Sequence, residues 1–423
     1  MLIAGLALII VLLVVGTPIW VVIGLPSAIF ILISGVPETL IIQRMFAGMD
    51  EFIFIAIPLF LLAGEIMNIA GLTERLLNFA NILFGRMRAN LAMISLFLSG
   101  VVSGISGSAL ADASAVGGLL IPKMKENGYS AGFASAVVAA GSIVGPVIPP
   151  SVTFILYAVL TGTSVSDLFL AGVVPGILII ALLMVTVQWM AYRGKLPGRS
   201  TIVVNQSKKQ VMTSALPVLL LPVLIVGGIR GGFYTPTEGA AWAVVYSLIL
   251  GLIYRRVNGK AMFKGLLQVS QGLGEILLMI ASASLLSWIL VAQQIPDAIG
   301  EAILSVTQDK LLILIVMNLV LLLIGCILEN IPAMIVFVPI LLPIANTVGI
   351  DPIHLGVIIN VNLMIGAIHP PVGIVLFVTS RIAKVRLEEA SMALIPLILS
   401  VLVSLVLITY IPGLSLWLPQ LFK

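Results

Sequence analysis

The sequence predicts an all-α integral membrane protein with two inverted repeats, each containing a re-entrant helical hairpin and a broken helix. Three observations support this prediction: the composition, the distribution of basic residues, and a set of glycines and prolines that recurs at one fixed spacing. Of the 423 residues, 61% are hydrophobic and 9% are charged, whereas soluble domains carry roughly 25% charged residues. Residues 1–423 are therefore expected to form a single polytopic membrane domain.

The same composition excludes several classes of function. No hydrophilic block is long enough to fold as an aqueous catalytic domain, and no nucleophile–base pairing is visible among the titratable residues, so an enzyme is not expected. The single cysteine, Cys326, excludes a multi-cysteine metal site, and no cofactor is expected. The net charge of +4 is distributed by loop, which is a sign of membrane topology and not of nucleic-acid binding.

Apolar runs separated by polar turns define the expected membrane spans. They lie near residues 2–15, 18–34, 52–70, 130–160, 168–192, 215–229, 239–254, 266–292, 355–380 and 391–411. The first run lacks a basic start and a cleavage site, so it is expected to be a retained span. Because the first two runs are shorter than the ~20 residues that cross a bilayer untilted, one long tilted span is an alternative to two.

Two further apolar stretches, residues 91–121 and 311–345, are expected to be re-entrant hairpins that return to their starting side. The 21 basic residues then divide 17 to 4 between the two faces. The rich face receives Arg75, Arg86, Arg88, Lys123, Lys125, Arg193, Lys195, Arg199, Lys208, Lys209, Arg255, Arg256, Lys260, Lys264, Arg381, Lys384 and Arg386. The other face receives Arg44, Arg230, Lys310 and Lys423. The rich face is expected to be cytoplasmic.

An internal repeat appears when the chain is aligned with itself at an offset of 221 positions, which pairs residues 104–175 with 325–396. The identities are Gly104/Gly325, Pro122/Pro343, Gly128/Gly349, Gly145/Gly366, Pro149/Pro370, Pro150/Pro371 and Pro175/Pro396. With 39 Gly and 23 Pro in the chain, chance gives about 0.8 such matches. Glycine and proline bend or break helices, so the copies share backbone geometry.

By the topology above, the first copy starts inside and the second outside, so the repeats are inverted. The first repeat is expected over about 1–192, a cytoplasmic linker over about 193–214, and the second repeat over about 215–411. The basic part of this linker is expected to contact anionic lipid. Inverted repeats with helices broken at corresponding positions are typical of secondary transporters, whose site lies near the bilayer midplane.

The polar segments of the repeats predict what such a site binds. The hairpin tips are expected at "SGISGSALAD" and "GCILENIPA", opposite the breaks "GPVIPPS" and "GAIHPPVG". Paired prolines remove amide donors and free carbonyl oxygens, which together with serine hydroxyls suit a cation such as Na⁺. No Lys or Arg is expected within the membrane, so an anion there needs helix N-termini and co-bound cations. We therefore expect transport of the anion to be coupled to a cation.

Five motifs carry a resemblance to a known family: "GSALADASAVGGLLIP", "IVGPVIPPS", "AIPLFLLAGEIMNIAGL", "GGIRGGFYTPTEGAA" and "IGAIHPPVG". In this order they resemble the large membrane subunit of tripartite ATP-independent periplasmic (TRAP) transporters, of the DctM/SiaM type. The resemblance implies Na⁺-driven uptake of carboxylates, such as C4-dicarboxylates, sialic acid or other sugar acids, across the bacterial inner membrane. It also implies a small Q-type membrane subunit, a P-type periplasmic binding protein and an elevator-type movement of the hairpin domain.

The resemblance also implies site residues. The first Na⁺ site would use Ser106, Gly107, Ser108, Gly145, Ile148 and Pro150. The second Na⁺ site would use Glu329, Asn330, Gly366, Ile368 and Pro371. The substrate would contact Ser108, Asp112, Asn330 and Asn362. The chain departs from the family pattern at Glu329, where Asp is common, and at His369, where Thr is common.

Alternatives stay open at this point. The Ser/Gly tip could serve close helix packing, and Asp112 could cap a helix without touching a ligand. A related function would be a self-sufficient Na⁺-coupled divalent-anion transporter that needs no binding protein. A different one would be an anion channel, which could also use helix dipoles but would need neither a Na⁺ gradient nor paired broken hairpins.

Overall fold

The structure is a computed structural model that describes residues 2–200, 207–256, 258–369 and 373–422, and the regular secondary structure in these ranges is helical. Seven helical segments among the described residues are long and apolar enough to cross a membrane. They are Phe52–Ile69, Val165–Tyr192, Lys208–Arg230, Pro236–Ile253, Gly259–Ala292, Asn330–Thr347 and Leu387–Tyr410. The predicted all-α membrane fold is confirmed.

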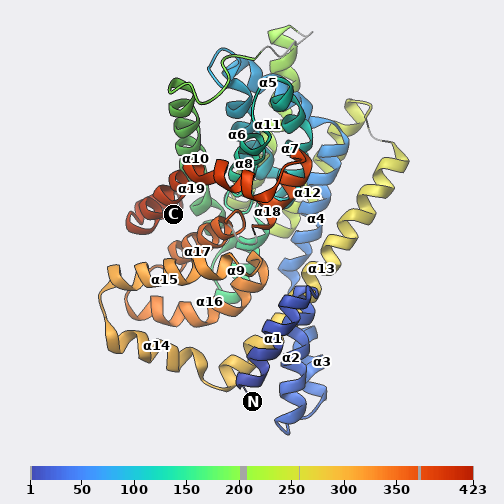
Figure 1. Cartoon of the computed structure of the whole chain (residues 1–423). Helices are drawn as coiled ribbons and strands as arrows, with labels where there is room; N and C mark the ends of the chain where they lie inside the picture. Colours follow the sequence, from blue (N-terminus) through green and yellow to red (C-terminus); the bar gives the residue numbers. More distant parts are fainter. Residues whose placement is uncertain (1, 201–206, 257, 370–372, 423) are drawn as a thin grey trace.

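Each half of the chain contains a helical hairpin, a helix in two pieces and a long helix, in that order (Figure 1). In the first half these are α6 (Asn90–Ser106), α7 (Ala109–Glu126), α8 (Ala131–Ser142), α9 (Val152–Thr161) and α10 (Val165–Tyr192). In the second half they are α15 (Lys310–Gly325), α16 (Asn330–Thr347), α17 (Pro352–Gly366), α18 (Ile374–Ala383) and α19 (Leu387–Tyr410). The hairpins and breaks thus coincide with the glycine and proline repeat.

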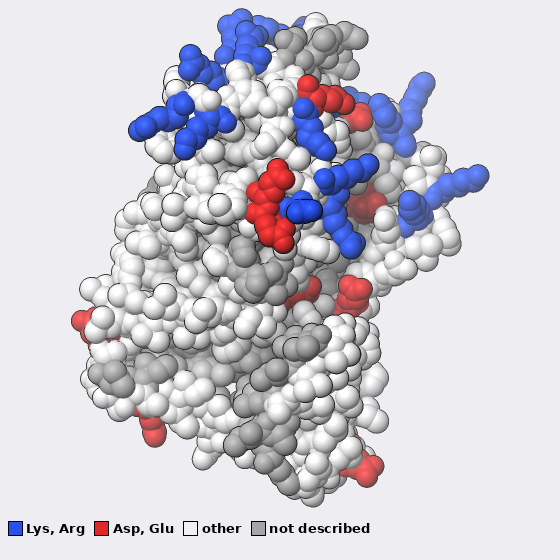
Figure 2. Space-filling view, in the orientation of Figure 1, with Lys and Arg blue, Asp and Glu red and all other residues white. Residues whose placement is uncertain are grey.

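The first hairpin returns to the side from which it starts. Asn90, at its beginning, exchanges hydrogen bonds of 2.9 and 3.0 Å with the backbone of Ser200. Just past its end, a Cβ atom on Gly128 would lie 3.9 Å from the ring of Pro197. Both ends therefore lie along residues 197–200. On the face drawn in Figure 2, Lys and Arg side chains gather toward the end where α5 (Leu72–Phe84) is labelled in Figure 1.

The remaining helices lie beside the hairpins and broken helices. They are α1 (Leu2–Val15), α2 (Ile19–Ile33), α3 (Thr39–Met49), η1 (Phe52–Ile55), α4 (Ala56–Ile69), α5, α11 (Lys208–Arg230), α12 (Pro236–Ile253), α13 (Gly259–Ala292), α14 (Ile295–Val306) and α20 (Gly413–Leu421). Helices α2, α3 and α4 pack along α13, and α4 also packs on α12 (Figure 1). We call α4, α11, α12 and α13 the framework helices.

The N-terminal residues and the linker show how local signals set helix ends. Residues 2–33 form two helices, α1 and α2, separated at Gly16–Pro18, and not one continuous helix. Helix α11 begins at Lys208, inside the expected linker, because Ser207 and Gln210 form a capping box ahead of the apolar run. Helices α3, α5, α14 and α20 were not expected from the apolar runs.

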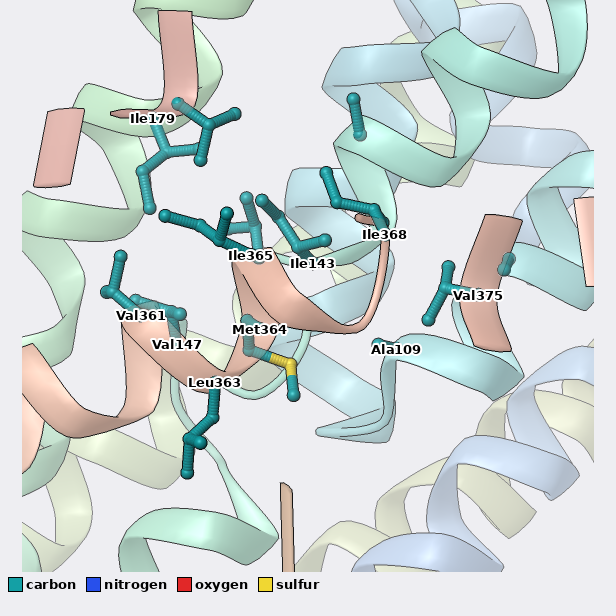
Figure 3. Packing of buried hydrophobic residues seen from close by; sticks show 14 of the residues in the cluster. Ala109, Ile143, Val147, Ile179, Val361, Leu363, Met364, Ile365, Ile368 and Val375 are labelled. Atoms are coloured by element: carbon teal, nitrogen blue, oxygen red, sulfur yellow. The ribbon is translucent and has the colours of Figure 1, made fainter. Parts of the chain in front are cut away.

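An apolar core joins the two broken helices. Ile143 and Val147, which follow α8, belong to the same buried cluster as Val361, Ile365 and Ile368 of the second broken helix (Figure 3). Each of these five side chains is at most 1% exposed. This packing holds the two breaks against each other at the centre of the molecule and fixes their position relative to the hairpin tips.

Candidate functional site

Both hairpin tips and both helix breaks meet at one cavity of about 140 Å³, which we call the tip cavity. It is lined by Leu61, Gly107, Ser108, Ala109, Leu110, Pro146, Val152, Thr153, Ile276, Gly325, Cys326, Ile327, Leu328, Glu329, Asn330, Ile331, Met364, Gly366, Ala367, Gly373, Ile374 and Val375. Two of these residues, Leu61 and Ile276, come from the framework helices. The others belong to the hairpins and broken helices of both repeats.

Four helices begin on the tip cavity. Their first residues, which line it, are Ala109 of α7, Val152 of α9, Asn330 of α16 and Ile374 of α18. A helix N-terminus carries about half a positive charge and unsatisfied amide donors, so it favours an anion. Glu329 is the one charged residue among the described residues that line the cavity. Two other helices, α15 and α17, end on the cavity at Gly325 and Gly366, and their C-terminal carbonyls favour a cation. Positive potential for an anion therefore has to come from the four N-termini.

The first tip is held against the first break by its backbone. Gly107 ends α6 with φ +61°, and Ser108 caps α7 by accepting a hydrogen bond from the amide of Ala111 at 3.4 Å. A Cβ atom on Gly107 would lie 2.7 Å from the carbonyl oxygen of Pro150. Only glycine suits both the left-handed conformation and this close approach. The structure thus brings together Gly107, Ser108 and Pro150 of the expected first cation site.

Asp112, in the first turn of α7, bonds back to the end of α6 and so stabilises the turn of the first hairpin. It is fully buried, and it accepts hydrogen bonds from Ser106 Oγ to Oδ1 at 2.6 Å and from Ser103 Oγ to Oδ2 at 2.8 Å. A Cβ atom on Gly145 would lie 2.8 Å from Oδ2, so the carboxylate also packs on the first break. Because a carboxylate only accepts hydrogen bonds, the Ser106 hydroxyl must donate to it. Ser106 Oγ in turn accepts from the amide of Ser108 at 3.2 Å, which leaves one lone pair for another partner.

Asp112 does not line the tip cavity. With Ser106 it lines a neighbouring cavity of about 370 Å³ that also contains Glu65 of α4 and Gln268 of α13. Ile148, expected at the first cation site, lines a third, largely apolar cavity between α10 and α11. The structure therefore places these two side chains beside the tip cavity and not in it.

The second tip also contacts the break of its own repeat through backbone atoms, here between two glycines. Gly325, at the end of α15, packs on Gly366, at the end of α17, and a Cβ atom on Gly325 would lie 3.2 Å from the Cα atom of Gly366. Sγ of Cys326 lies 3.5 Å from Nδ1 of His369. Glu329 precedes α16 and makes no side-chain hydrogen bond to cap it. Ile368 is fully buried behind the break, and Pro371 lies outside the described residues.

The two asparagines expected at the substrate site lie in different places. Asn330 lines the tip cavity together with Ser108, and its Nδ2 donates to Oδ1 of Asn360 at 3.0 Å. Asn362 is fully buried, and its Nδ2 donates to Oδ1 of Asn318 at 2.6 Å, away from the tip cavity. Successive helix positions are about 100° apart, so Asn360 and Asn362 point to different sides of α17.

Sequence reasoning missed Asn360 and Thr153. Asn360 Nδ2 donates to the carbonyl oxygen of Pro146, and Thr153 Oγ1 donates to Asn360 Oδ1 at 2.9 Å. The only signal for Asn360 was an amide at the centre of an apolar run. Thr153 carried a signal as well, because it lies three residues after the proline pair of the first break.

Comparison with known proteins decides the family. The family described as "Tripartite ATP-independent periplasmic transporter, DctM component" matches residues 6–414. The chain belongs to this family. It is 37% identical to the sialic acid TRAP transporter large permease protein SiaM of Vibrio cholerae, over 90% of this chain and 89% of SiaM. It is 38% identical to the C4-dicarboxylate TRAP transporter large permease protein DctM of Pseudomonas aeruginosa, over 94% and 93%.

A solved structure shares the fold. The Alcanivorax borkumensis YdaH transporter superposes with a TM-score of 0.53 at 14% identity, over 90% of this chain and 88% of YdaH. The family and the apolar helices make the chain a multi-pass protein of the bacterial inner membrane, and the TRAP relatives are transporter permeases, which is not an enzymatic role. The resemblance seen in the five motifs is thereby confirmed.

Proposed function

We propose that this TRAP permease imports a small carboxylate together with Na⁺. The observation that supports this most directly is the convergence of four helix N-termini on a cavity whose lining, among the described residues, carries one charged side chain, Glu329. The four N-terminal dipoles attract an anion, whereas Glu329 and the C-termini of α15 and α17 repel it and attract cations. Cations at the two tips would balance the carboxylate and make anion and cation binding mutually dependent.

The first cation is proposed to bind between the first tip and the first break. Ser106, Gly107 and Ser108 supply oxygens from the tip, and carbonyls around Gly145, Ile148 and Pro150 supply them from the break. The contact between Gly107 and Pro150 and the orientation of Ser106 by Asp112 support this assignment. Hydroxyl and carbonyl oxygens are hard ligands, as an alkali cation requires.

The second cation is proposed to bind between the second tip and the second break. Glu329 and Asn330 would supply side-chain oxygens, and carbonyls around Gly366, Ile368 and Pro371 the remainder. The backbone contact of Gly325 with Gly366 supports this site, because it brings the tip onto the end of α17. Glu329 would also give this site a full negative charge that the first site lacks on the cavity wall.

Substrate class and partners follow from the relatives. SiaM is named for sialic acid and DctM for C4-dicarboxylates, both carboxylic acids, so a carboxylate is proposed here as well. The family name is tripartite and the relatives are called large permease proteins. We therefore propose that the chain works with a small Q-type membrane subunit and a P-type periplasmic binding protein, which delivers the substrate.

Transport is proposed to follow an elevator mechanism. The hairpins and broken helices of both repeats surround the tip cavity. Ile143 and Val147 of the first break cluster with Val361 and Ile365 of the second, so these elements are proposed to move as one body (Figure 3). The framework helices contribute only Leu61 and Ile276 to the described lining. Movement of the hairpin body along them would carry the whole site across the membrane.

The experiment is uptake into proteoliposomes that contain the chain with its small subunit. Radiolabelled sialic acid and succinate are offered with the encoded binding protein, under an inward Na⁺ gradient or an equal K⁺ gradient. We expect accumulation only with Na⁺ and binding protein. Accumulation by the chain without the binding protein would favour the self-sufficient transporter, and uptake that ignores the Na⁺ gradient would favour a channel.

A further inference from the structure

The side chain of Asn360 joins three separate elements of the site. It projects from α17, and its Nδ2 donates to the carbonyl oxygen of Pro146 in the first break. Its Oδ1 accepts from Thr153 Oγ1, in the first turn of α9, at 2.9 Å and from Asn330 Nδ2, at the start of α16, at 3.0 Å. One fully buried amide therefore connects the first break to the second hairpin tip.

Asparagine suits this position because of its hydrogen-bonding groups. An amide has one oxygen with two lone pairs and one nitrogen with two donors. Both lone pairs of Asn360 are used, by a hydroxyl and by an amide, and its nitrogen is directed at a carbonyl. Aspartate would lack the donor, and leucine would lack every bond. The contacts fix the orientation of the Asn360 side chain and, through it, that of Asn330.

Fixing Asn330 has a consequence at the tip cavity. With Nδ2 turned to Asn360, the Oδ1 atom of Asn330 is buried and has no hydrogen-bond partner among the described residues. Asn330 is 8% exposed and lines the tip cavity. A buried amide oxygen without a partner is costly, and a bound cation would satisfy it. Asn360 thus determines which end of Asn330 is available for a ligand.

The other end of the connection lies in the first break. Pro146 follows Gly145 and precedes Ile148, whose neighbouring carbonyls are assigned to the first cation. The Pro146 carbonyl accepts from Asn360 and also from Ser151 Oγ. Any change in this loop when the first cation binds is passed to Asn360, and from there to Asn330.

We propose that Asn360 is a positioning residue that couples the two cation sites, so that occupancy of one tip favours occupancy of the other. This inference rests on the proposed Na⁺-dependent function. Coupling of this kind is reciprocal and commonly changes affinity by a factor of about 5 to 150. The effect to measure is therefore cooperativity in Na⁺ binding.

The chain provides its own reporter for this measurement. Cys326 is its single cysteine, and it lies at the second tip on the wall of the tip cavity. The purified full chain is treated with a maleimide while Na⁺ is raised at constant ionic strength with K⁺, and the labelling rate is recorded. We expect a sigmoidal Na⁺ dependence in the native chain and, in Asn360→Ala, a hyperbolic one shifted at least several-fold to higher Na⁺.

A matched control separates coupling from loss of a buried hydrogen bond. Asn318→Ala removes another buried amide, 9% exposed, that bonds to Asn362 and Thr409 outside the tip cavity, and it should keep the sigmoidal response. Thr153→Val removes a single hydroxyl of the connection and should lower the cooperativity partly. It keeps the test informative if Asn360→Ala does not fold.

The outcomes distinguish the two proposals. If Na⁺ and K⁺ act alike on Cys326 in the native chain, the proposed Na⁺ coupling itself fails. If the native response to Na⁺ is hyperbolic, or if Asn360→Ala and Thr153→Val remain as sigmoidal as Asn318→Ala, Na⁺ binding stands but the coupling role of Asn360 is wrong.

Discussion

Gly325 and Gly366 touch through their backbones where the second hairpin meets the second helix break. A Cβ atom on Gly325 would lie 3.2 Å from the Cα atom of Gly366, and one on Gly366 would overlap the backbone of Gly325. In their partners in the repeat, a Cβ atom on Gly104 would lie 3.4 Å from the carbonyl oxygen of Pro149, and one on Gly145 would lie 3.1 Å from the amide nitrogen of Ala109. Close backbone approach explains why these glycines recur while side chains differ.

Gly366→Ala should therefore force the second tip away from the break. Overpacking of this kind costs about 1–3 kcal/mol, and displacement of the tip should abolish Na⁺-dependent uptake. The control is Gly118→Ala in α7, where no atom lies within 4 Å of the added methyl group and where alanine should stabilise the helix by about 0.5–1 kcal/mol. Thermal unfolding of both variants measures the stability, and equal midpoints would contradict the close contact.

Asp112→Asn should weaken the first cation site without unfolding the tip. The carboxylate obliges Ser106 to donate to it, and an amide of the same size would let Ser106 turn its hydroxyl elsewhere. Hydrogen bonds to charged groups contribute about 1.5–3 kcal/mol, so half-saturating Na⁺ for uptake should rise roughly tenfold or more. Ser114→Ala, an exposed hydroxyl on the same helix, should leave the Na⁺ titration unchanged; an unchanged titration in Asp112→Asn would remove Asp112 from the site.

The elevator proposal predicts that joining the first hairpin to α11 stops transport. A Cβ atom on Gly104 would lie 3.3 Å from Cβ of Pro222, near the separation found in disulfides, about 3.5–4.5 Å. In a Cys326→Ser background, the pair Gly104→Cys and Pro222→Cys should cross-link on oxidation, lose uptake and regain it on reduction. Each single-cysteine variant, oxidised in the same way, is the control. Full uptake by the cross-linked chain would mean that the hairpin does not move along α11.

The fold could be predicted from the sequence because helix breaks and hairpin turns require glycine or proline, and both residue types are visible in the sequence. The breaks near Pro149 and at Gly366 lie where glycine and proline recur, and the first hairpin turns at Gly107, three residues after the recurring Gly104. The short helices α3, α5, α14 and α20 were not predicted, since they do not have the length of a membrane span. The division into two repeats and a linker stays a prediction.

The candidate site was predicted in part. Ser106, Ser108 and Asp112 are close in sequence, so their proximity follows from a single turn of chain. Asn360 and Pro146 are 214 residues apart, and no local sequence pattern predicts their hydrogen bond. Asn362 seemed equivalent to Asn330, but its place on α17 directs it to Asn318. Pairing across repeats depends on how the two broken helices pack, which one sequence does not specify.

The most direct test of the central claim, that oxygens of the tips and breaks bind Na⁺, is equilibrium binding of ²²Na⁺ to the purified chain. We predict saturable binding that unlabelled Na⁺ displaces and K⁺ does not, and that is weakened in Ser108→Ala and in Pro150→Ala. Binding that does not saturate, or that is the same in the native chain and in both variants, would contradict the account.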